Sequence, residues 1–152
     1  SRTKVLLSKV LVYTTLLSAF NAVVWVASYA SMKSYDTPFD ERAFWILGGM
    51  TVGAHLAFAT LGFLGSVFVT RSRSVYAGSL GLVLVMYAIQ LVADVGENFK
   101  FLGCLSPMKW ASGPDILSEG TAAPGYVAAL VAVNLAALVL ACVFYQKKDI
   151  LI

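Results

Sequence analysis

Four long apolar runs, at residues 5–29, 43–70, 75–95 and 124–145, constrain the fold of this chain more than any other feature. Each run can cross the hydrocarbon core of a bilayer, which is roughly 30 Å thick and takes about 20 helical residues to span. Because no water reaches the backbone there, the segments must satisfy their own hydrogen bonds as α-helices. Only 12% of the residues are charged, whereas soluble domains average about 25%. The sequence therefore predicts an all-α membrane protein, a single four-transmembrane-helix bundle.

The connections between the runs differ in length and character. Residues 31–42 form a first outer loop with Pro38 and several charges, residues 71–74 form a short basic turn, and residues 96–123 form a long second outer loop with several Gly and Pro residues. The first apolar run is too long for the core of a signal peptide, so we expect a retained helix.

The basic residues predict the orientation of the bundle. Seven of them fall on the side that holds both ends of the chain and four on the other side, which predicts that both termini face the inner side, meaning the cytosol, matrix or stroma. We expect a multi-pass protein of an organellar inner membrane or the plasma membrane. The seven are Arg2, Lys4, Lys9, Arg71, Arg73, Lys147 and Lys148, and the four are Lys33, Arg42, Lys100 and Lys109.

Small residues in the second and fourth runs predict the closest helix packing. In a membrane, helices associate through close packing of small side chains rather than through burial alone. The second run contains Gly49 and Gly53 at four-residue spacing, and the fourth contains Ala128, Ala132 and Ala136. We expect these two helices to make the tightest contact, although the alanines could instead pack against another subunit.

Polar residues inside the runs are the candidate site. His55, the only histidine, lies near the middle of the second run, Asn134 and Tyr87 lie at similar depth, and Asn21 lies in the first run. An unpaired polar group is costly in hydrocarbon, so we expect His55, Asn134 and Tyr87 to face inward and hydrogen-bond one another, and Asn21 to bond to a neighbouring helix. Alternatively, His55 could ligate a haem, hydrogen-bond a quinone, or carry protons. The leading expectation is a structural histidine without a cofactor.

The second outer loop is the predicted recognition surface. Loops of this length are often functional, and this one carries Phe99, Phe101 and Trp110 among few charges. We expect these aromatic residues to contact a partner, and a short helix around residues 115–118. At the start of the loop, Asp94 and Glu97 share a helical face, which predicts a solvated helix end with Lys100 beside it.

The motifs of common enzymes are absent from the sequence: it has no phosphate-binding glycine loop, no CxxC pair, no HExxH and no GxSxG. Its basic residues are scattered, so no nucleic-acid partner is expected. The expected function is a non-enzymatic accessory or scaffold protein that packs against other membrane protein subunits, a second copy of itself, and lipids. The alternatives are a haem- or quinone-binding membrane anchor that uses His55, and a small channel or carrier.

In hydropathy, the layout of four spans with a larger second outer loop resembles tetraspan families such as the MARVEL-type and claudin-like proteins. The first outer loop lacks the W…GLW…C…C signature of the claudin-like proteins, and Cys104 is the only cysteine in the second outer loop. No family is therefore assigned from the sequence.

Overall fold

The protein is described by a computed structural model that covers residues 2–35, 38–68, 72–95, 99–104 and 106–147. Over these residues the chain is nearly all helical. Four helices are long and apolar enough to cross a membrane, which confirms the predicted number of spans and is consistent with a multi-pass membrane protein. They are α1 (Arg2–Ser34), α2 (Glu41–Phe68), α3 (Ser72–Val95) and α7 (Pro124–Lys147); the short helices α4 (Lys100–Gly103), α5 (Pro107–Trp110) and α6 (Gly113–Glu119) lie between α3 and α7.

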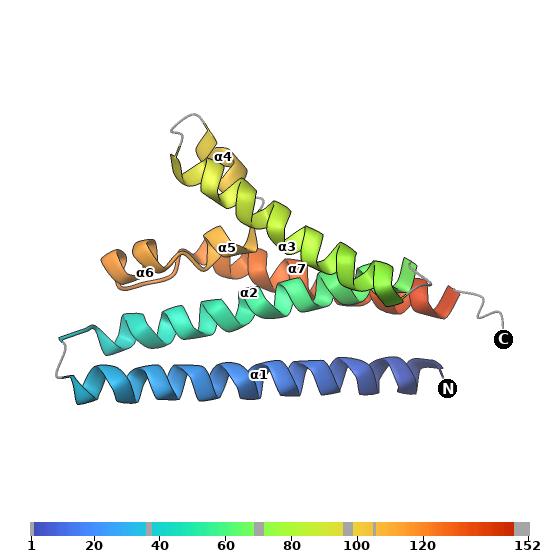
Figure 1. Ribbon diagram of the computed structural model, residues 1–152, viewed down its shortest axis with the longest axis horizontal. Helices are drawn as coiled ribbons and strands as arrows, with labels where there is room; N and C mark the ends of the chain where they lie inside the picture. Colours follow the sequence, from blue (N-terminus) through green and yellow to red (C-terminus); the bar gives the residue numbers. More distant parts are fainter. Residues whose placement is uncertain (1, 36–37, 69–71, 96–98, 105, 148–152) are drawn as a thin grey trace.

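Helix α2 is the centre of the molecule. It contacts α1, α3, α5, α6 and α7, and its contact with α7 is the most extensive in the fold. Figure 1 shows α1 running beside α2 in the opposite direction, while α3 diverges from α2 toward its C-terminal end and α5 lies in the space between them. The beginning of α1 and the end of α7 lie at the same end of the molecule.

A carboxylate cap and a cluster of aromatic rings form the corner between α1 and α2. Asp40 accepts hydrogen bonds from the backbone N–H groups of Arg42 and Ala43, at 2.8 and 3.2 Å, and so satisfies donors that the first turn of α2 would otherwise leave free. Lys33 of α1 pairs with Glu41 of α2. The rings of Trp25, Tyr29, Phe39, Phe44 and Trp45 pack in edge-to-face and tilted pairs around this corner.

The prediction that the second and fourth long helices pack most closely is confirmed, but the contact uses other residues than the predicted ones. Helix α7 buries Leu130, Ala137 and Ala141. Leu130 forms a core cluster with Met50, Ala54 and Ala57 of α2, and with Trp110 and Ile116. The contact face of α7 therefore combines one large side chain with small ones.

The predicted alanine stripe lies on the opposite side of α7. Ala128, Ala132 and Ala136 are all exposed, so the expectation that they pack against the second helix is wrong. Spacing of four residues places side chains on one face of a helix but does not say which face meets the neighbour. Of the two predicted packing glycines of α2, only one faces α7. A Cβ atom at Gly53 would lie 3.3 Å from Leu130 Cδ1, whereas one at Gly49 would meet nothing within 4 Å.

The chain between α3 and α7 folds back against the bundle. Ser106 is fully buried, donates its hydroxyl to the Met86 carbonyl at 3.4 Å, and caps α5 by accepting from the Met108 N–H at 3.3 Å. The expected short helix is present as α6, which ends at Gly120 with a positive φ of 67°. Such a φ suits glycine, because other side chains are strained there.

Candidate functional site

His55 and Asn134 belong to two separate hydrogen-bonded groups on different faces of α2. The expectation that His55, Asn134 and Tyr87 bond one another is therefore wrong. The first group joins α2 to α7. The Asn134 amide donates to the Gly53 carbonyl at 3.2 Å and to the Leu130 carbonyl in its own helix at 2.8 Å. Thr60 is buried, donates to the Ala57 carbonyl at 3.0 Å and approaches Asn134 Oδ1 at 3.4 Å. Asn134 thus joins α7 directly to the backbone of α2 at Gly53.

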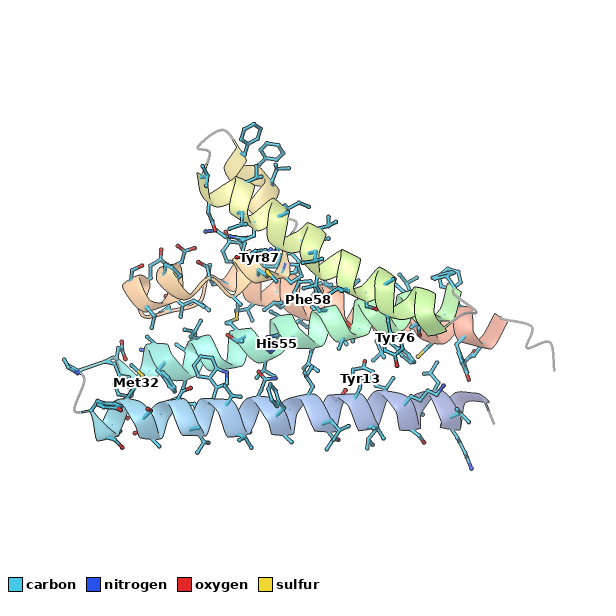
Figure 2. All side chains as sticks on the ribbon, viewed as in Figure 1. Tyr13, Met32, His55, Phe58, Tyr76 and Tyr87 are labelled. Carbon is cyan, nitrogen blue, oxygen red and sulfur yellow. The ribbon has the colours of Figure 1, made fainter. Side chains whose placement is uncertain are left out.

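The second group joins α2 to α1. His55 Nδ1 lies 2.9 Å from Asn21 Oδ1, and the Asn21 amide donates to the Leu17 carbonyl at 2.8 Å. Asn21 is buried, whereas His55 is exposed. Figure 2 shows His55 on the side of α2 that faces α1. The expectation that Asn21 bonds to a neighbouring helix is confirmed.

A cavity of about 490 Å³ lies beside His55. Four elements line it: α1 through Leu17 and Phe20, α2 through Thr51, Ala54, His55 and Phe58, α3 through Val83, and the α5 segment through Met108 and Ala111. The Thr51 hydroxyl donates to the Leu47 carbonyl at 2.8 Å, within its own helix. Of the two polar side chains in this wall, Thr51 bonds within α2, whereas the His55 imidazole bonds to a residue of another helix, Asn21 of α1.

Two of the predicted site residues lie elsewhere than expected. Tyr87 is half exposed and belongs to neither hydrogen-bonded group, so the expectation that it faces inward is wrong. Trp110 is only 8% exposed. It lies in the core cluster and donates its indole N–H to the Cys104 carbonyl at 3.1 Å. Its assignment to a partner-binding surface is therefore wrong, because the loop folds inward and uses this ring for packing.

Phe99 and Phe101, the other two aromatic residues of the predicted recognition surface, are exposed. Whether they bind a partner stays a prediction. Asp94 lies in the last turn of α3, and both of its carboxylate oxygens accept from Gln90 Nε2 at 2.9 Å. Its predicted neighbour Glu97 lies outside the described residues.

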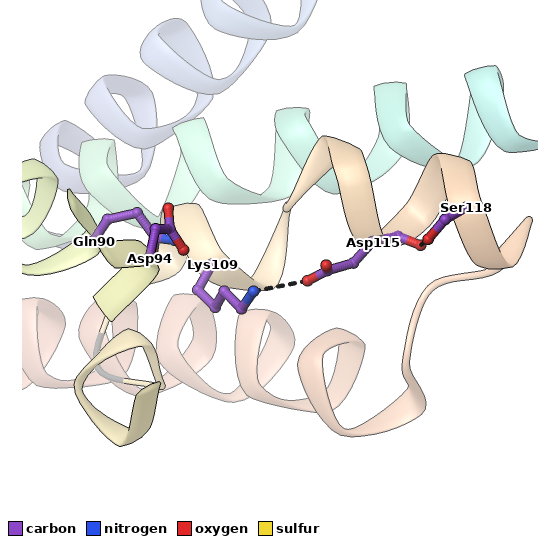
Figure 3. Close-up of polar contacts among 5 residues, drawn as sticks. All are labelled: Gln90, Asp94, Lys109, Asp115 and Ser118. Carbon is purple, nitrogen blue, oxygen red and sulfur yellow. Dashed lines mark hydrogen bonds and ion pairs between the residues drawn. The ribbon is translucent and has the colours of Figure 1, made fainter. Parts of the chain in front are cut away.

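An ion pair joins α5 to α6. Lys109 Nζ lies 2.8 Å from Asp115 Oδ2, as drawn in Figure 3 with Gln90, Asp94 and Ser118 nearby. The hydrogen bond from Lys109 lowers the pKa of Asp115, and the same bond raises the pKa of Lys109. Both side chains remain partly exposed, so the pair stabilises the position of α6 only modestly.

Candidate metal ligands and thiols are scattered in the described part of the chain. No group of three or more His, Cys, Asp or Glu residues there could hold a metal ion. Cys104 is exposed, Cys142 is partly buried, and both are free. His55 is thus the described group in the long helices with the clearest capacity to meet a ligand.

The sequence singled out Asn21, His55 and Asn134 but did not indicate that Asn21 and His55 bond to each other or that Asn134 bonds to the Gly53 carbonyl. It also missed Thr60, Met108 and the contact of Gly48 with Trp25, whose ring would lie 3.2 Å from a Cβ atom at position 48. When small residues recur every four or five positions, the spacing does not indicate which of them packs against an aromatic ring.

Comparisons with protein-family models, with curated proteins and with solved structures found no match.

Proposed function

We propose that this chain is a non-enzymatic integral membrane protein that acts as an accessory or scaffold subunit. It associates within the membrane with another membrane protein or with a second copy of itself. This role requires neither a soluble domain nor a catalytic group, because contacts between helix faces within the membrane are sufficient for it.

The observation that carries the proposal is the position of the alanine stripe on α7. Ala128, Ala132 and Ala136 are exposed on the side opposite Leu130, Ala137 and Ala141. Small side chains at four-residue spacing let the backbone of a second helix approach closely, which favours van der Waals packing and interhelical hydrogen bonds in lipid. The stripe leaves such an approach open, because no helix among the described residues covers it.

We further propose that the common end of α1 and α7 faces the cytosol, matrix or stroma. The basic residues near that end outnumber those of the other side, which is the distribution expected for an inner face. The exposed Phe99 and Phe101 then lie toward the outer side, where aromatic residues commonly contact partners or the interface.

Native purification in a mild detergent, followed by mass determination of the complex, tests the proposal. Ala132→Phe places a bulky ring on the stripe and is expected to release the partner or the second copy. Val127→Phe is the matched control, since Val127 is also exposed on α7 but lies away from the stripe, and it should leave the complex intact. A chain that runs as a lone monomer before any substitution would contradict the proposal.

A further inference from the structure

We propose that the cavity beside His55 is a binding site for a lipid-soluble phenol of the hydroquinone type, held by a hydrogen bond from its hydroxyl group to His55 Nε2. This site is separate from the subunit contact proposed above, which uses the exposed side of α7. It involves binding only, with no transfer of electrons or atoms.

The first step of the argument is the position of the imidazole proton. The Leu17 carbonyl can only accept a hydrogen bond, so the group of Asn21 that meets it at 2.8 Å must be the NH₂. The Asn21 oxygen then faces His55 Nδ1 at 2.9 Å. Because an amide oxygen can only accept, Nδ1 carries the hydrogen. Asn21 is a positioning residue that fixes the tautomer and the orientation of the ring.

The second step concerns the other ring nitrogen. In the neutral imidazole with its hydrogen on Nδ1, Nε2 presents a lone pair and accepts a hydrogen bond. No described residue donates to Nε2, and the His55 side chain is exposed at the cavity wall. His55 also lies 14 residues after Glu41, or about 20 Å along α2 at roughly 1.5 Å per residue. An acceptor at that depth in hydrocarbon gains a partner only from a ligand or a trapped water.

The third step is the chemistry of the wall. The rest of the lining is apolar apart from Thr51, whose hydroxyl bonds within α2. Phe20 of α1 and Phe58 of α2 line the cavity together with the imidazole, and Met108 adds a polarisable side chain. Aromatic rings and methionine sulfur favour contact with another ring. At about 490 Å³, the cavity is within the usual size range of small-molecule sites.

These features together select the ligand. An acyl chain has no donor for Nε2, and a quinone carbonyl is itself an acceptor, so neither matches the lone pair. Haem iron could take the lone pair, but no described residue of the lining is a lysine or arginine that could neutralise its two propionates. A hydroquinone combines a ring, an O–H donor and an apolar tail. The cavity is partly open at its surface, so the tail can extend out of it toward lipid.

The test uses the single histidine of the chain. Full-length protein labelled with ¹⁵N in histidine and placed in lipid nanodiscs gives one pair of imidazole resonances. A decyl-substituted para-hydroquinone, kept reduced, is expected to shift the Nε2 resonance toward the protonated value while the Nδ1 resonance changes little. Its dimethyl ether has nearly the same shape without a donor and should leave Nε2 unshifted.

Several outcomes would overturn the inference. They are an unshifted Nε2 with the hydroquinone, an equal shift with the ether, a shift with cholesterol but none with the hydroquinone, or an Nε2 that is already protonated before any ligand is added. The ether arm uses the unaltered protein, so the result does not depend on a variant that folds.

A binding titration supplies a second, independent readout. His55→Phe keeps a ring of similar size but removes the acceptor, and should weaken hydroquinone binding about five- to tenfold, as the loss of one hydrogen bond implies. Tyr87→Phe removes a hydroxyl from α3, outside the cavity lining, and should leave the affinity unchanged. Equal affinity of the His55→Phe protein and the original would overturn the assignment of Nε2.

Discussion

At the scale of single residues, the place of a polar residue within its apolar run indicates how deep the residue lies in the membrane. It does not indicate which neighbouring helix the side chain faces. The positions of His55, Asn21 and Asn134 within their apolar runs predict that each needs a hydrogen-bond partner. The structure gives His55 and Asn21 to one interface of α2 and Asn134 to another. The partner of Asn134 could not be predicted, because it is a backbone carbonyl, at Gly53, rather than a side chain.

Replacement of Asn134 tests the strength of that contact. Asn134→Leu keeps the number and branching of the side-chain heavy atoms but removes the donor to Gly53, so it should lower the free energy of unfolding by about 0.5–1.7 kcal/mol, the range seen for polar contacts between membrane helices. Reversible unfolding in mixed detergent micelles measures the change. Ala132→Leu, on the exposed side of the same helix, should leave the free energy of the isolated chain unchanged.

The two glycines of the predicted pair should respond in opposite ways to enlargement. Gly53→Val drives a side chain into Leu130, and overpacking of this kind costs about 1–3 kcal/mol. Gly49→Val meets nothing within 4 Å and removes the low helix propensity of glycine, so stability should stay equal or rise slightly. The same unfolding assay compares them. A larger loss for Gly49→Val than for Gly53→Val would contradict the described α2–α7 interface.

At the scale of elements, apolar runs predict long helices well and irregular connections poorly. Each predicted span has its long helix, because an uninterrupted apolar run has few other ways to exist in a bilayer. Helix α2 contains residues 43–68 of its predicted span, and residues 69–70 lie outside the described residues. Helix α3 begins at Ser72, so the expectation of a turn over residues 71–74 is wrong for its last three residues. The segment 96–123 was expected to be an exposed recognition loop, yet Trp110 packs into the core. A short aromatic segment between Gly and Pro residues is compatible with an exposed loop and with a segment packed against the core. Only contacts with residues distant in sequence decide between the two.

Trp110 and Phe101 form a matched pair for this segment. Trp110→Ala removes a buried ring and the hydrogen bond to the Cys104 carbonyl, so it should lower the free energy of unfolding by about 3 kcal/mol, at the low end for buried aromatic residues. Phe101→Ala should change it by less than about 0.5 kcal/mol, since this side chain is 66% exposed. Equal effects would show that the segment does not fold inward as described.

The link between α5 and α6 should depend on pH. Because the pKa of Asp115 is lowered in the folded protein, its contribution is present above the unfolded pKa and is lost as the pH falls through the folded value. The pKa of Lys109 is raised, so its contribution is present below the unfolded value and is lost as the pH rises through the folded one. Between these limits the pair should add about 0.2–1 kcal/mol.

Asp115→Asn isolates this contribution. The difference in unfolding free energy between the original protein and the variant should be constant near neutral pH and shrink toward zero under acid conditions. A difference that stays constant into strong acid would contradict the ion pair with Lys109.

At the scale of the whole molecule, the number of long helices follows from the sequence and their arrangement follows only in part. The α2–α7 contact was predicted from small residues, although the alanines that suggested it face away. The placement of α1 depends on Asn21, Trp25 and the corner at Asp40, which form no repeat that a hydropathy pattern would reveal. A path of four long helices brings the beginning of α1 and the end of α7 to the same end of the molecule. Which side of the membrane that end faces depends on the distribution of basic residues.

The most direct test of the account is the sidedness of four single cysteines in a chain without Cys104 and Cys142. Lys4→Cys and Gln146→Cys mark the beginning of α1 and the end of α7, and Tyr35→Cys and Ser118→Cys mark the opposite end. In sealed vesicles, a membrane-impermeant thiol reagent should label positions 4 and 146 from the inner side only, and positions 35 and 118 from the outer side only. Labelling of positions 4 and 146 from different sides would contradict a four-span bundle with both ends of its path on one face.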